Sequence, residues 1–382
     1  MHDVAIVGGG LAGAATAIHL AQLGLRVVVL ERNTGPRRKP CGEGLFRRGV
    51  KELERLGVLD DLRHCSSDLA GVRFHAGPHT ATAEPHWGAG IGVRREALDA
   101  AVLARAEAAG AEIRPGVTAR GLLREGRHVA GVATSHGDVP AKVVVAADGL
   151  NSRIRRLAGL EGSSRGARYG ISAHVRLAAP PGHFVEVYFE DRFELYLTPV
   201  GASDANVALL LRKPAMQRFA GRLAEEYEAT LRAHPALAAG FELLDEPLAA
   251  GPFAANATRS WRANLVLVGD AAGFFDGITG EGMSVALVSA HQCAAAVCSY
   301  LETGEYDGFR TFERSRRSLV RNSNLLGRVS LALGSQPPLA RWSVRNLERR
   351  PATFEKLVGI SAGEHRLRDL RPRDFLALAA GL

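Results

Sequence analysis

A glycine-rich turn near the start of the chain has the residue types and spacing of a phosphate-binding loop. Its six residues are Gly8, Gly9, Gly10, Leu11, Ala12 and Gly13, which fit the pattern G-x-G-x-x-G. Gly8 permits a tight turn, Gly10 lets a pyrophosphate approach the backbone, and Gly13 lets the following helix pack closely on the strand. The free N–H groups at the start of that helix then face the phosphate. The expected strand covers 3–7 and the expected helix covers 12–23.

An acidic residue stands at the position that completes this unit. The expected second strand, 25–30, ends directly before Glu31, which lies 18 residues after Gly13. A carboxylate at this place accepts hydrogen bonds from an adenosine ribose and disfavours a 2′-phosphate. The β-α-β unit therefore predicts binding of FAD or NAD rather than NADP. It does not distinguish FAD from NAD.

Two later segments favour FAD. Residues 145–155 read VAADGLNSRIR, in which a strand leads into Asp148, and residues 265–283 read LVLVGDAAGFFDGITGEGM. In the second segment Asp270 follows a buried strand, where its carboxylate can accept hydrogen bonds from ribityl hydroxyls. Backbone N–H groups around Gly280, Gly282 and Met283 can face the flavin C2 carbonyl and N1, where negative charge collects on reduction.

These three motifs, in this order, resemble those of the FAD-dependent oxidoreductases of the aromatic-hydroxylase (group A flavin monooxygenase) superfamily. The resemblance covers residues 1–300. Three features are similar to the geranylgeranyl-reductase-like branch: Gly273 after Asp-Ala-Ala, Thr-Gly-Glu-Gly at 279–282, and Lys-Pro-Cys-Gly at 39–42. The resemblance implies FAD held without a covalent bond and NAD(P)H as a transient electron donor.

The resemblance also implies a set of residues that contact FAD. Ala12, Glu31 and Arg32 are expected at the ADP half, and Cys41 and Gly42 beside the isoalloxazine or the ribityl chain. Further along the chain, the expected contacts are Arg95 at the adenosine or pyrophosphate, the Val117 backbone at adenine, and Asp148, Asp270 and Met283 at the remaining parts of the cofactor.

The resemblance leaves two reactions open. The main expectation is a monooxygenase that hydroxylates an apolar or aromatic substrate through a flavin C4a-hydroperoxide. The alternative is a reductase of isoprenoid or polyketide C=C bonds, and a third, remote possibility is a non-catalytic protein that binds lipid or prenyl groups. The branch's Tyr-x-Trp-x-Phe-Pro signature is reduced to ELYLTP at 194–199, which weakens a specific prenyl-reductase assignment. Cys41 and Tyr196 are the weak catalytic candidates, and the basic run 37–39 is expected to favour the Cys41 thiolate.

The elements expected around these motifs define an α/β fold. A discontinuous Rossmann-like FAD-binding domain is expected over 1–70, 95–164 and 256–301. An antiparallel substrate domain, expected from period-2 alternation, covers 71–94 and 165–255 and includes a helix at about 214–233. A helical C-terminal region follows over 302–382. Its Arg residues, among them Arg316, Arg317 and Arg321, indicate either a solvated helix face or contact with a membrane surface.

Composition sets outer limits on function. The 382 residues are 46% hydrophobic and 23% charged, which excludes disordered, collagen-like and disulfide-scaffold proteins. The net charge of +8 comes mainly from scattered Arg. It reflects either the coding composition or an anionic partner, and we expect no nucleic acid. The four cysteines have no ligand spacing, so neither a disulfide nor a metal site is expected. No transmembrane helix is expected, and a cytoplasmic location fits.

Overall fold

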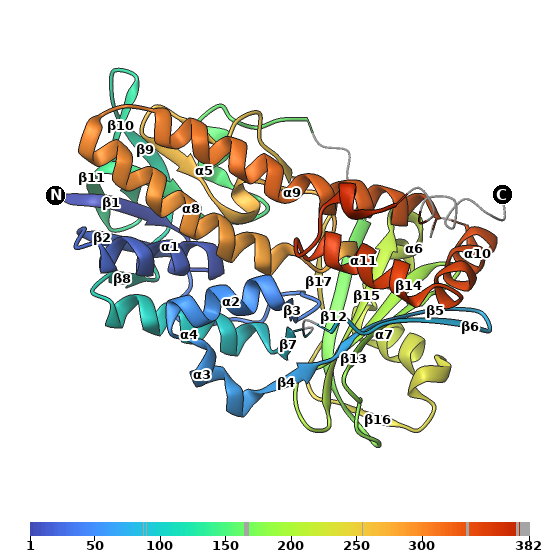
Figure 1. The fold of residues 1–382 in the computed structure, drawn as a ribbon. Helices are drawn as coiled ribbons and strands as arrows, with labels where there is room; N and C mark the ends of the chain where they lie inside the picture. Colours follow the sequence, from blue (N-terminus) through green and yellow to red (C-terminus); the bar gives the residue numbers. More distant parts are fainter. Residues whose placement is uncertain are drawn as a thin grey trace.

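The structure is a computed structural model in which residues 1–86, 88, 90–163, 168–253, 255–333, 336–371 and 374 are described. Two large β-sheets lie side by side along the long axis of the molecule, and the C-terminal helices span both (Figure 1). The predicted boundary between residues 164 and 165 and the end of the predicted C-terminal region fall outside the described residues.

The first sheet is mainly parallel and contains the predicted β-α-β unit. The strands run in the order β19-β20-β11-β1-β2-β8, with β9 and β10 forming a hairpin on β11. β1, β2, β8, β11 and β20 pair in parallel. The strand bounds are β1 His2–Val7, β2 Val27–Glu31, β8 Glu112–Pro115, β9 Ala119–Glu125, β10 His128–Thr134, β11 Gly137–Ala146, β19 Trp261–Arg262 and β20 Leu265–Leu267.

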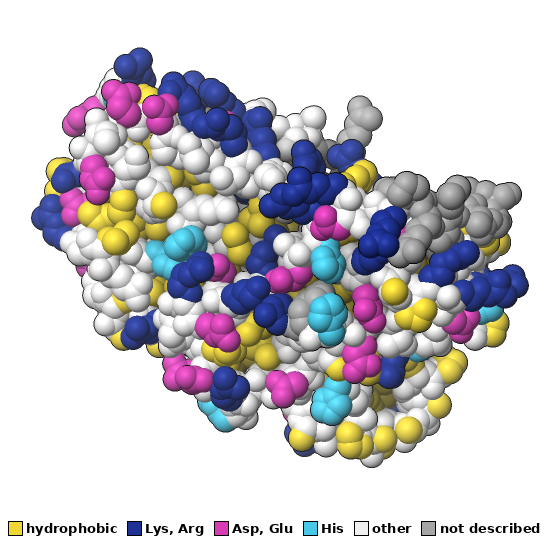
Figure 2. Space-filling model, in the orientation of Figure 1, with side chains coloured by type: hydrophobic (Ala, Val, Ile, Leu, Met, Phe, Trp, Pro, Cys, Tyr) yellow, Lys and Arg dark blue, Asp and Glu magenta, His cyan; other side chains and the backbone are white. Residues whose placement is uncertain are grey.

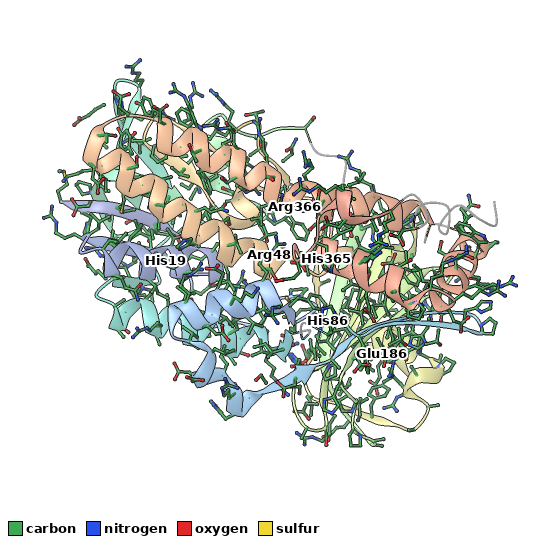
Figure 3. All side chains as sticks on the ribbon, in the orientation of Figure 1. His19, Arg48, His86, Glu186, His365 and Arg366 are labelled. Atoms are coloured by element: carbon green, nitrogen blue, oxygen red, sulfur yellow. The ribbon has the colours of Figure 1, made fainter. Side chains whose placement is uncertain are left out.

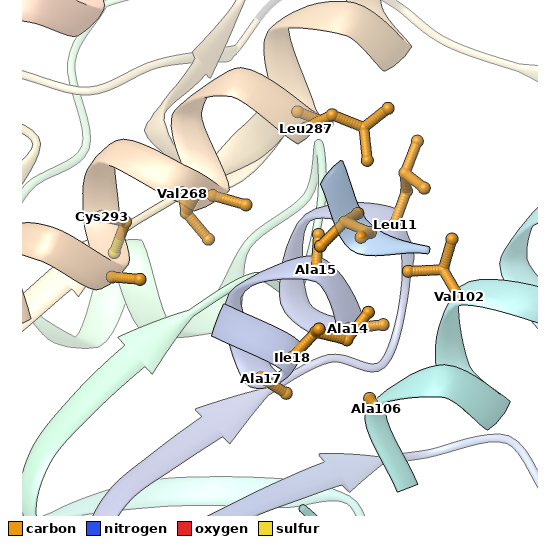
Figure 4. Close-up of a cluster of buried hydrophobic side chains, with 14 of the residues drawn as sticks. Leu11, Ala14, Ala15, Ala17, Ile18, Val102, Ala106, Val268, Leu287 and Cys293 are labelled. Atoms are coloured by element: carbon orange, nitrogen blue, oxygen red, sulfur yellow. The ribbon is translucent and has the colours of Figure 1, made fainter. Parts of the chain in front are cut away.

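Three helices pack together on one face of this sheet. They are α1 Leu11–Gln22, α4 Arg95–Ala108 and α8 Gly282–Thr303, and α1 contacts both of the others. Small residues of α1 such as Ala14 belong to one buried cluster with Val102 of α4 and Leu287 of α8, which lets the helices approach closely (Figure 4). By length and composition α8 could cross a membrane, but half of its apolar window is buried within the protein. It therefore packs as a core helix of this domain.

The second sheet is mainly antiparallel, as the period-2 alternation predicts. Its order is β16-β12-β15-β14-β13-β5-β6, with β17 also on β12 and a parallel pair at β13 and β5. Its strands are β5 Gly71–Ala76, β6 His79–Ala83, β12 Arg168–Leu177, β13 Phe184–Phe189, β14 Phe193–Pro199, β15 Asp204–Arg212, β16 Phe241–Leu243 and β17 Leu248–Ala250. Tyr227 and Leu231 of helix α7 (Leu223–Arg232) pack into its core.

Shorter elements join the two sheets. A small sheet of β3, β7 and β4 lies between them, and β18 pairs with β21 beside the Asp270 loop. The bounds are β3 Gly44–Phe46, β4 Ser66–Leu69, β7 Gly90–Val93, β18 Ala255–Asn256, β21 Gly273–Phe274, α2 Arg47–Leu56, α3 Leu59–Leu62, α5 Arg153–Leu157, α6 Lys213–Met216 and α7 Leu223–Arg232.

Long helices make up most of the described part of the C-terminal region. They are α9 Asp307–Leu333, α10 Pro337–Glu348 and α11 Pro351–Ser361. α9 packs on α8, whereas α10 and α11 cover β6 of the second sheet. Figure 2 shows Lys and Arg gathered over α9 at the upper edge, with basic and acidic side chains mixed on the rest of that face. The exposed Arg317 and Arg321 fit the solvated-face interpretation of this helix, and the membrane interpretation gains no support.

Two sequence predictions need correction. The single helix expected at 214–233 is divided into the short helix α6, a 3-10 turn and α7, which starts at Leu223. Gly221 has a left-handed φ of 75°, which ends the helical conformation before α7. Arg316 does not belong to the solvated face. It is 6% exposed and its Nη2 donates to the carbonyl oxygen of Gly273 at 2.8 Å.

Candidate functional site

One large cavity lies between the two sheets. Its volume is about 1320 Å³, and both sheets, the loop 39–44, the start of α8 and the C-terminal helices line it. Of the predicted residues, all but Gly13 line this cavity: Gly8, Gly10, Leu11, Ala12, Glu31, Arg32, Cys41, Gly42, Arg95, Val117, Asp148, Tyr196, Asp270, Gly280, Gly282 and Met283. The fold therefore brings together positions from the whole length of the chain.

The glycine turn leaves space where a phosphate must come close to the backbone. Gly8 has φ of 103°, and a Cβ on Gly13 would lie 1.9 Å from the Gly8 carbonyl oxygen, so neither position tolerates a side chain. A Cβ on Gly10 would meet only Lys39 Nζ, at 3.5 Å. Gly10 thus faces the cavity beside a cationic group. This arrangement fits a pyrophosphate at the N-terminus of α1.

The acidic group at the end of β2 is already held in place. Glu31 accepts hydrogen bonds from the backbone N–H of Gly9 at 2.8 Å and of Asn33 at 2.9 Å. Its carboxylate therefore links the glycine turn to the end of β2. Oε1 also accepts from the Asn33 side-chain amide, whereas Oε2 accepts only from Gly9 and has a further lone pair for a ribose hydroxyl.

In two of the residues expected to contact FAD, some polar atoms are already hydrogen-bonded within the protein. The Val117 N–H donates to the Glu31 carbonyl oxygen at 2.9 Å, so only its own carbonyl is free to meet an adenine. The Asp148 carboxylate accepts from the Ser152 hydroxyl at 2.5 Å and from the Ile154 N–H at 3.0 Å. The carboxylate therefore contacts the first turn of α5, whose N-cap is Ser152.

A buried cation–anion group surrounds the centre of the site. Asp99 accepts from Arg95 Nε at 2.8 Å and from Lys39 Nζ at 2.6 Å, which fixes both cations beside the glycine turn. Burial raises the pKa of Asp270, while Arg95 and Arg316 oppose that rise. Lys39 and Asp99 were not identified as site residues from the sequence. The 95–99 spacing places Arg95 and Asp99 one helical turn apart, which was the available indication.

Two buried arginines donate hydrogen bonds to the backbone of the loop that carries Asp270. Arg155 Nη1 donates to the Ala271 carbonyl oxygen at 3.0 Å, and Arg316 Nη2 donates to that of Gly273 at 2.8 Å. Burial lowers the pKa of Arg316 to about 10. The segment 145–155 and helix α9 therefore stabilise the segment 265–283. The sequence predicted this role for neither Arg155 nor Arg316.

The loop that carries Cys41 is tied to the second sheet. Asn206 Nδ2 donates to the Cys41 carbonyl oxygen at 2.8 Å, and the Cys41 N–H donates to Ser172 Oγ at 3.4 Å. His174 hydrogen bonds to Glu43 at 2.8 Å and to Asp245 at 2.6 Å. Burial opposes a charge on His174, but these two carboxylates outweigh it and raise its pKa to about 9.

The expected Cys41 thiolate is wrong for this arrangement. Burial raises the pKa of the Cys41 thiol, and Arg95 only partly opposes this. Two of the three basic residues expected to lower it are paired elsewhere, Arg38 with Asp245 and Lys39 with Asp99. Cys41 is therefore a neutral thiol at the wall of the cavity.

At the start of α8 a buried carboxyl group faces the cavity. Burial raises the pKa of Glu281 to about 6, although Arg48 lies 3.4 Å away. Arg48 also meets the C-terminal segment, since a Cβ on Gly363 would lie 2.2 Å from its Nη1. Figure 3 shows Arg48 next to His365 of that segment.

Tyr196, the other catalytic candidate, lies on β14 of the second sheet and lines the cavity. Its hydroxyl donates to Glu194 at 2.9 Å, and Glu194 forms a two-point ion pair with Arg168 at 2.9 and 2.7 Å. Burial and the Glu194 charge raise the pKa of Tyr196 well above its usual value. The phenol proton is thus donated to Glu194, and Tyr196 also lines the cavity.

The FAD binding domain family matches residues 1–323 of the chain. The chain belongs to this family. It is an FAD-dependent oxidoreductase of the aromatic-hydroxylase superfamily with reductase-like relatives, as the motifs predicted, and FAD is its cofactor. The predicted contacts of individual residues with FAD remain predictions.

Known proteins of two kinds are similar to this oxidoreductase. Digeranylgeranylglycerophospholipid reductase 2 of Methanothermobacter thermautotrophicus is 30% identical over 323 residues, covering 80% of each chain. A putative 2-heptyl-3-hydroxy-4(1H)-quinolone synthase of Rhodococcus erythropolis is 29% identical and covers 83% of this chain and 84% of its own. The structure of the flavin-dependent brominase Bmp2 superposes with a TM-score of 0.85 at 17% identity, covering 99% and 98%. This last similarity concerns the fold alone.

Proposed function

We propose that this oxidoreductase uses reduced FAD to saturate C=C bonds of an isoprenoid chain. The observation that carries the proposal is an apolar part of the cavity lining on the side of the C-terminal helices, here called the apolar arm. The C-terminal helices supply the far walls of this arm through Trp342, Leu347, Phe354, Leu357 and Val358. This reverses the order of the two reactions expected from the sequence, in which hydroxylation came first.

The arm suits a long hydrocarbon. Phe74 and Val187 of the second sheet line its inner part, and Leu370 lines it near the C-terminal segment. Leu325 of α9 also lines the cavity and is 45% exposed, so the cavity reaches the surface there. An apolar chain that leaves water for this arm gains roughly 0.8 kcal/mol per buried CH₂ group. A compact aromatic substrate would leave most of the arm unfilled.

The relatives support the same reaction class. The similar Methanothermobacter protein is named as a reductase of a digeranylgeranyl lipid. The third motif carries Gly273 after Asp-Ala-Ala, the feature that separated the reductase-like branch from the hydroxylases in the sequence. Its φ of 123° is one that residues with a side chain rarely adopt.

The chain's own residues must bind the substrate, exclude water and supply a proton. When bound and reduced, FAD supplies a hydride to one carbon of the double bond. The other carbon needs a proton, and the Cys41 thiol holds one at neutral pH because burial raises its pKa. Its backbone is hydrogen-bonded to β12 and β15, which supports a role for this thiol next to the second sheet.

The proposal is tested with chemically reduced enzyme under nitrogen. Geranylgeranyl diphosphate and a digeranylgeranyl phospholipid serve as substrates, and mass spectrometry measures the hydrogens gained. We expect two hydrogens per reduced double bond. Cys41→Ser is expected to retain FAD and lose most of the turnover, whereas the remote exposed Leu23→Ser retains both. No saturated product from either lipid would contradict the proposal.

Oxygen insertion is the second candidate. It is favoured by the similar Rhodococcus protein, whose name describes a hydroxylated quinolone product. The same reduced enzyme, mixed with air and a 4-quinolone bearing an alkyl chain, distinguishes the two. A gain of one oxygen, with no anaerobic product from the lipids, would make hydroxylation the function.

A further inference from the structure

Two histidines and a glutamate from three different helices meet outside the FAD cavity. His19 lies on α1, Glu52 on α2 and His291 on α8, and one ligand atom of each lies within 4.8 Å of the others. None of the three lines the cavity. Figure 3 shows His19 on the face of the FAD-binding half, away from the labelled residues near the C-terminal segment.

We propose that these three side chains bind a divalent transition metal ion, with zinc as the best match. Two imidazoles and one carboxylate are a common protein ligand set for Zn²⁺, with water in the fourth position. The chemistry excludes Mg²⁺ and Ca²⁺, which prefer sites made only of oxygen ligands.

Buried polar atoms without partners point to a ligand. His19 Nε2 and Glu52 Oε2 are both buried and have no hydrogen-bond partner in the described structure. His19 is 9% exposed and Glu52 is 7% exposed. Leaving such atoms unsatisfied costs free energy, and a bound cation would satisfy both at once.

Each of the two imidazoles can offer a ring nitrogen to a metal. The two imidazole rings are 4.9 Å apart at 71°, an edge arrangement rather than a stack.

The positive charge of the neighbouring Arg55 disfavours binding of a cation. Arg55 Nη1 donates to Glu52 Oε1 at 2.7 Å. That contact uses the other carboxylate oxygen and leaves Oε2 for the metal. Arg55 is half exposed, so its charge is screened by water.

Closing the site requires only small side-chain movements. A tetrahedral ion with bonds of about 2.0–2.1 Å holds its ligands roughly 3.3 Å apart. His291 is exposed on α8 and can rotate toward the buried pair. The ion would then join α1, whose N-terminus carries the glycine turn, to α8, whose N-terminus carries Gly282 and Met283.

Such a site was hidden in the sequence. Its ligands lie on three helices that are far apart along the chain, and their spacing resembles no local metal motif. The inference is independent of the proposed reaction, because it concerns residues outside the cavity.

The test is titration of the purified holoenzyme, first treated with a chelator, with ZnCl₂ in a calorimeter and by thermal unfolding. We expect one zinc per chain and a higher melting temperature. His291→Gln should weaken binding by at least about 100-fold, since losing a group that merely orients a metal ligand already costs 10–100-fold. Glu52→Gln should do the same, whereas His64→Gln, at another exposed histidine, should change nothing.

Cobalt identifies the ligand atoms in the same variants. Co²⁺ bound by nitrogen and oxygen shows weak visible bands without the sulfur charge-transfer band that Cys41, Cys65 or Cys298 would produce. The absence of stoichiometric zinc, or equal zinc affinity in wild type and His291→Gln, would overturn the proposal. A sulfur band that persists in His291→Gln and Glu52→Gln would assign the metal to a thiol and also overturn it.

Discussion

His174 Nε2 and Glu43 Oε2 lie 2.8 Å apart, and this hydrogen bond joins the loop that carries Cys41 to strand β12 of the second sheet. Glu43 has φ of 59°, a left-handed backbone that few residues with side chains adopt, and its other carboxylate oxygen accepts from the Arg95 N–H at 2.7 Å. One buried carboxylate thus sets the position of the cavity loop relative to both halves of the protein. His174 and Glu43 are positioning residues for Cys41.

The charge on His174 makes this link sensitive to alkaline pH. Its folded pKa of about 9 lies above the usual value for histidine, so the link contributes its full stability below about pH 6.5 and loses it as pH rises through 9. The loss amounts to about 3 kcal/mol at most. We expect the free energy of unfolding of wild type to fall between pH 7 and 10. His174→Gln should be less stable at pH 7 and should lack this fall, and an equal pH slope in both proteins would refute the account.

Gly10→Val tests the phosphate cradle. The added side chain would occupy the space next to Lys39 Nζ that a pyrophosphate needs. We expect protein that folds, as judged by circular dichroism, but purifies without yellow colour. Gly35→Val is the matched control, because no atom lies within 4 Å of a Cβ there, and it should retain FAD. Full FAD content in Gly10→Val would place the phosphates elsewhere.

Arg316 and Arg317 are neighbours on α9 with opposite environments. Arg316 is buried and donates to Gly273, whereas the Arg317 side chain is 66% exposed and pairs with Glu313. Arg316→Leu should free the Asp270 loop and cost about 1.5–3 kcal/mol, the usual range for a hydrogen bond from a charged group. Arg317→Leu should stay within about 0.5 kcal/mol. Urea unfolding and FAD titration measure both, and equal effects would show that the Arg316 contact does not stabilise the loop.

Val358→Trp tests the apolar arm. The larger side chain would shorten the far end of the cavity while leaving the glycine turn untouched. We expect unchanged FAD affinity and a preference for shorter isoprenoids, seen as a higher KM for a C20 chain than for a C10 chain. Leu23→Trp, on the exposed end of the FAD-binding half, is the control. An unchanged chain-length profile would remove the arm from the substrate path.

The FAD-binding half could be predicted from the sequence because its motifs are local. The turn Gly8–Gly13, Glu31 and Asp270 follow rules that depend on a few adjacent residues, and the structure places them around one cavity as expected. Contacts between residues far apart in the sequence could not be predicted. Arg316 looked like one more surface arginine, and the Glu43–His174 pair spans 131 positions.

The sequence also did not distinguish hydroxylation from reduction. The motifs describe how FAD is held, and hydroxylases and reductases hold it alike. The apolar arm depends on where α10 and α11 pack, which the alternation of apolar residues in 337–361 does not specify.

The most direct test of the proposed function is a single turnover without oxygen. Enzyme carrying reduced FAD is mixed under nitrogen with one equivalent of geranylgeranyl diphosphate or digeranylgeranyl phospholipid, and the return of the yellow oxidised flavin is followed. The account predicts that the colour returns with at least one of the two lipids and that one double bond is saturated per flavin. Flavin that stays reduced with both lipids and reoxidises only when air is admitted would contradict it.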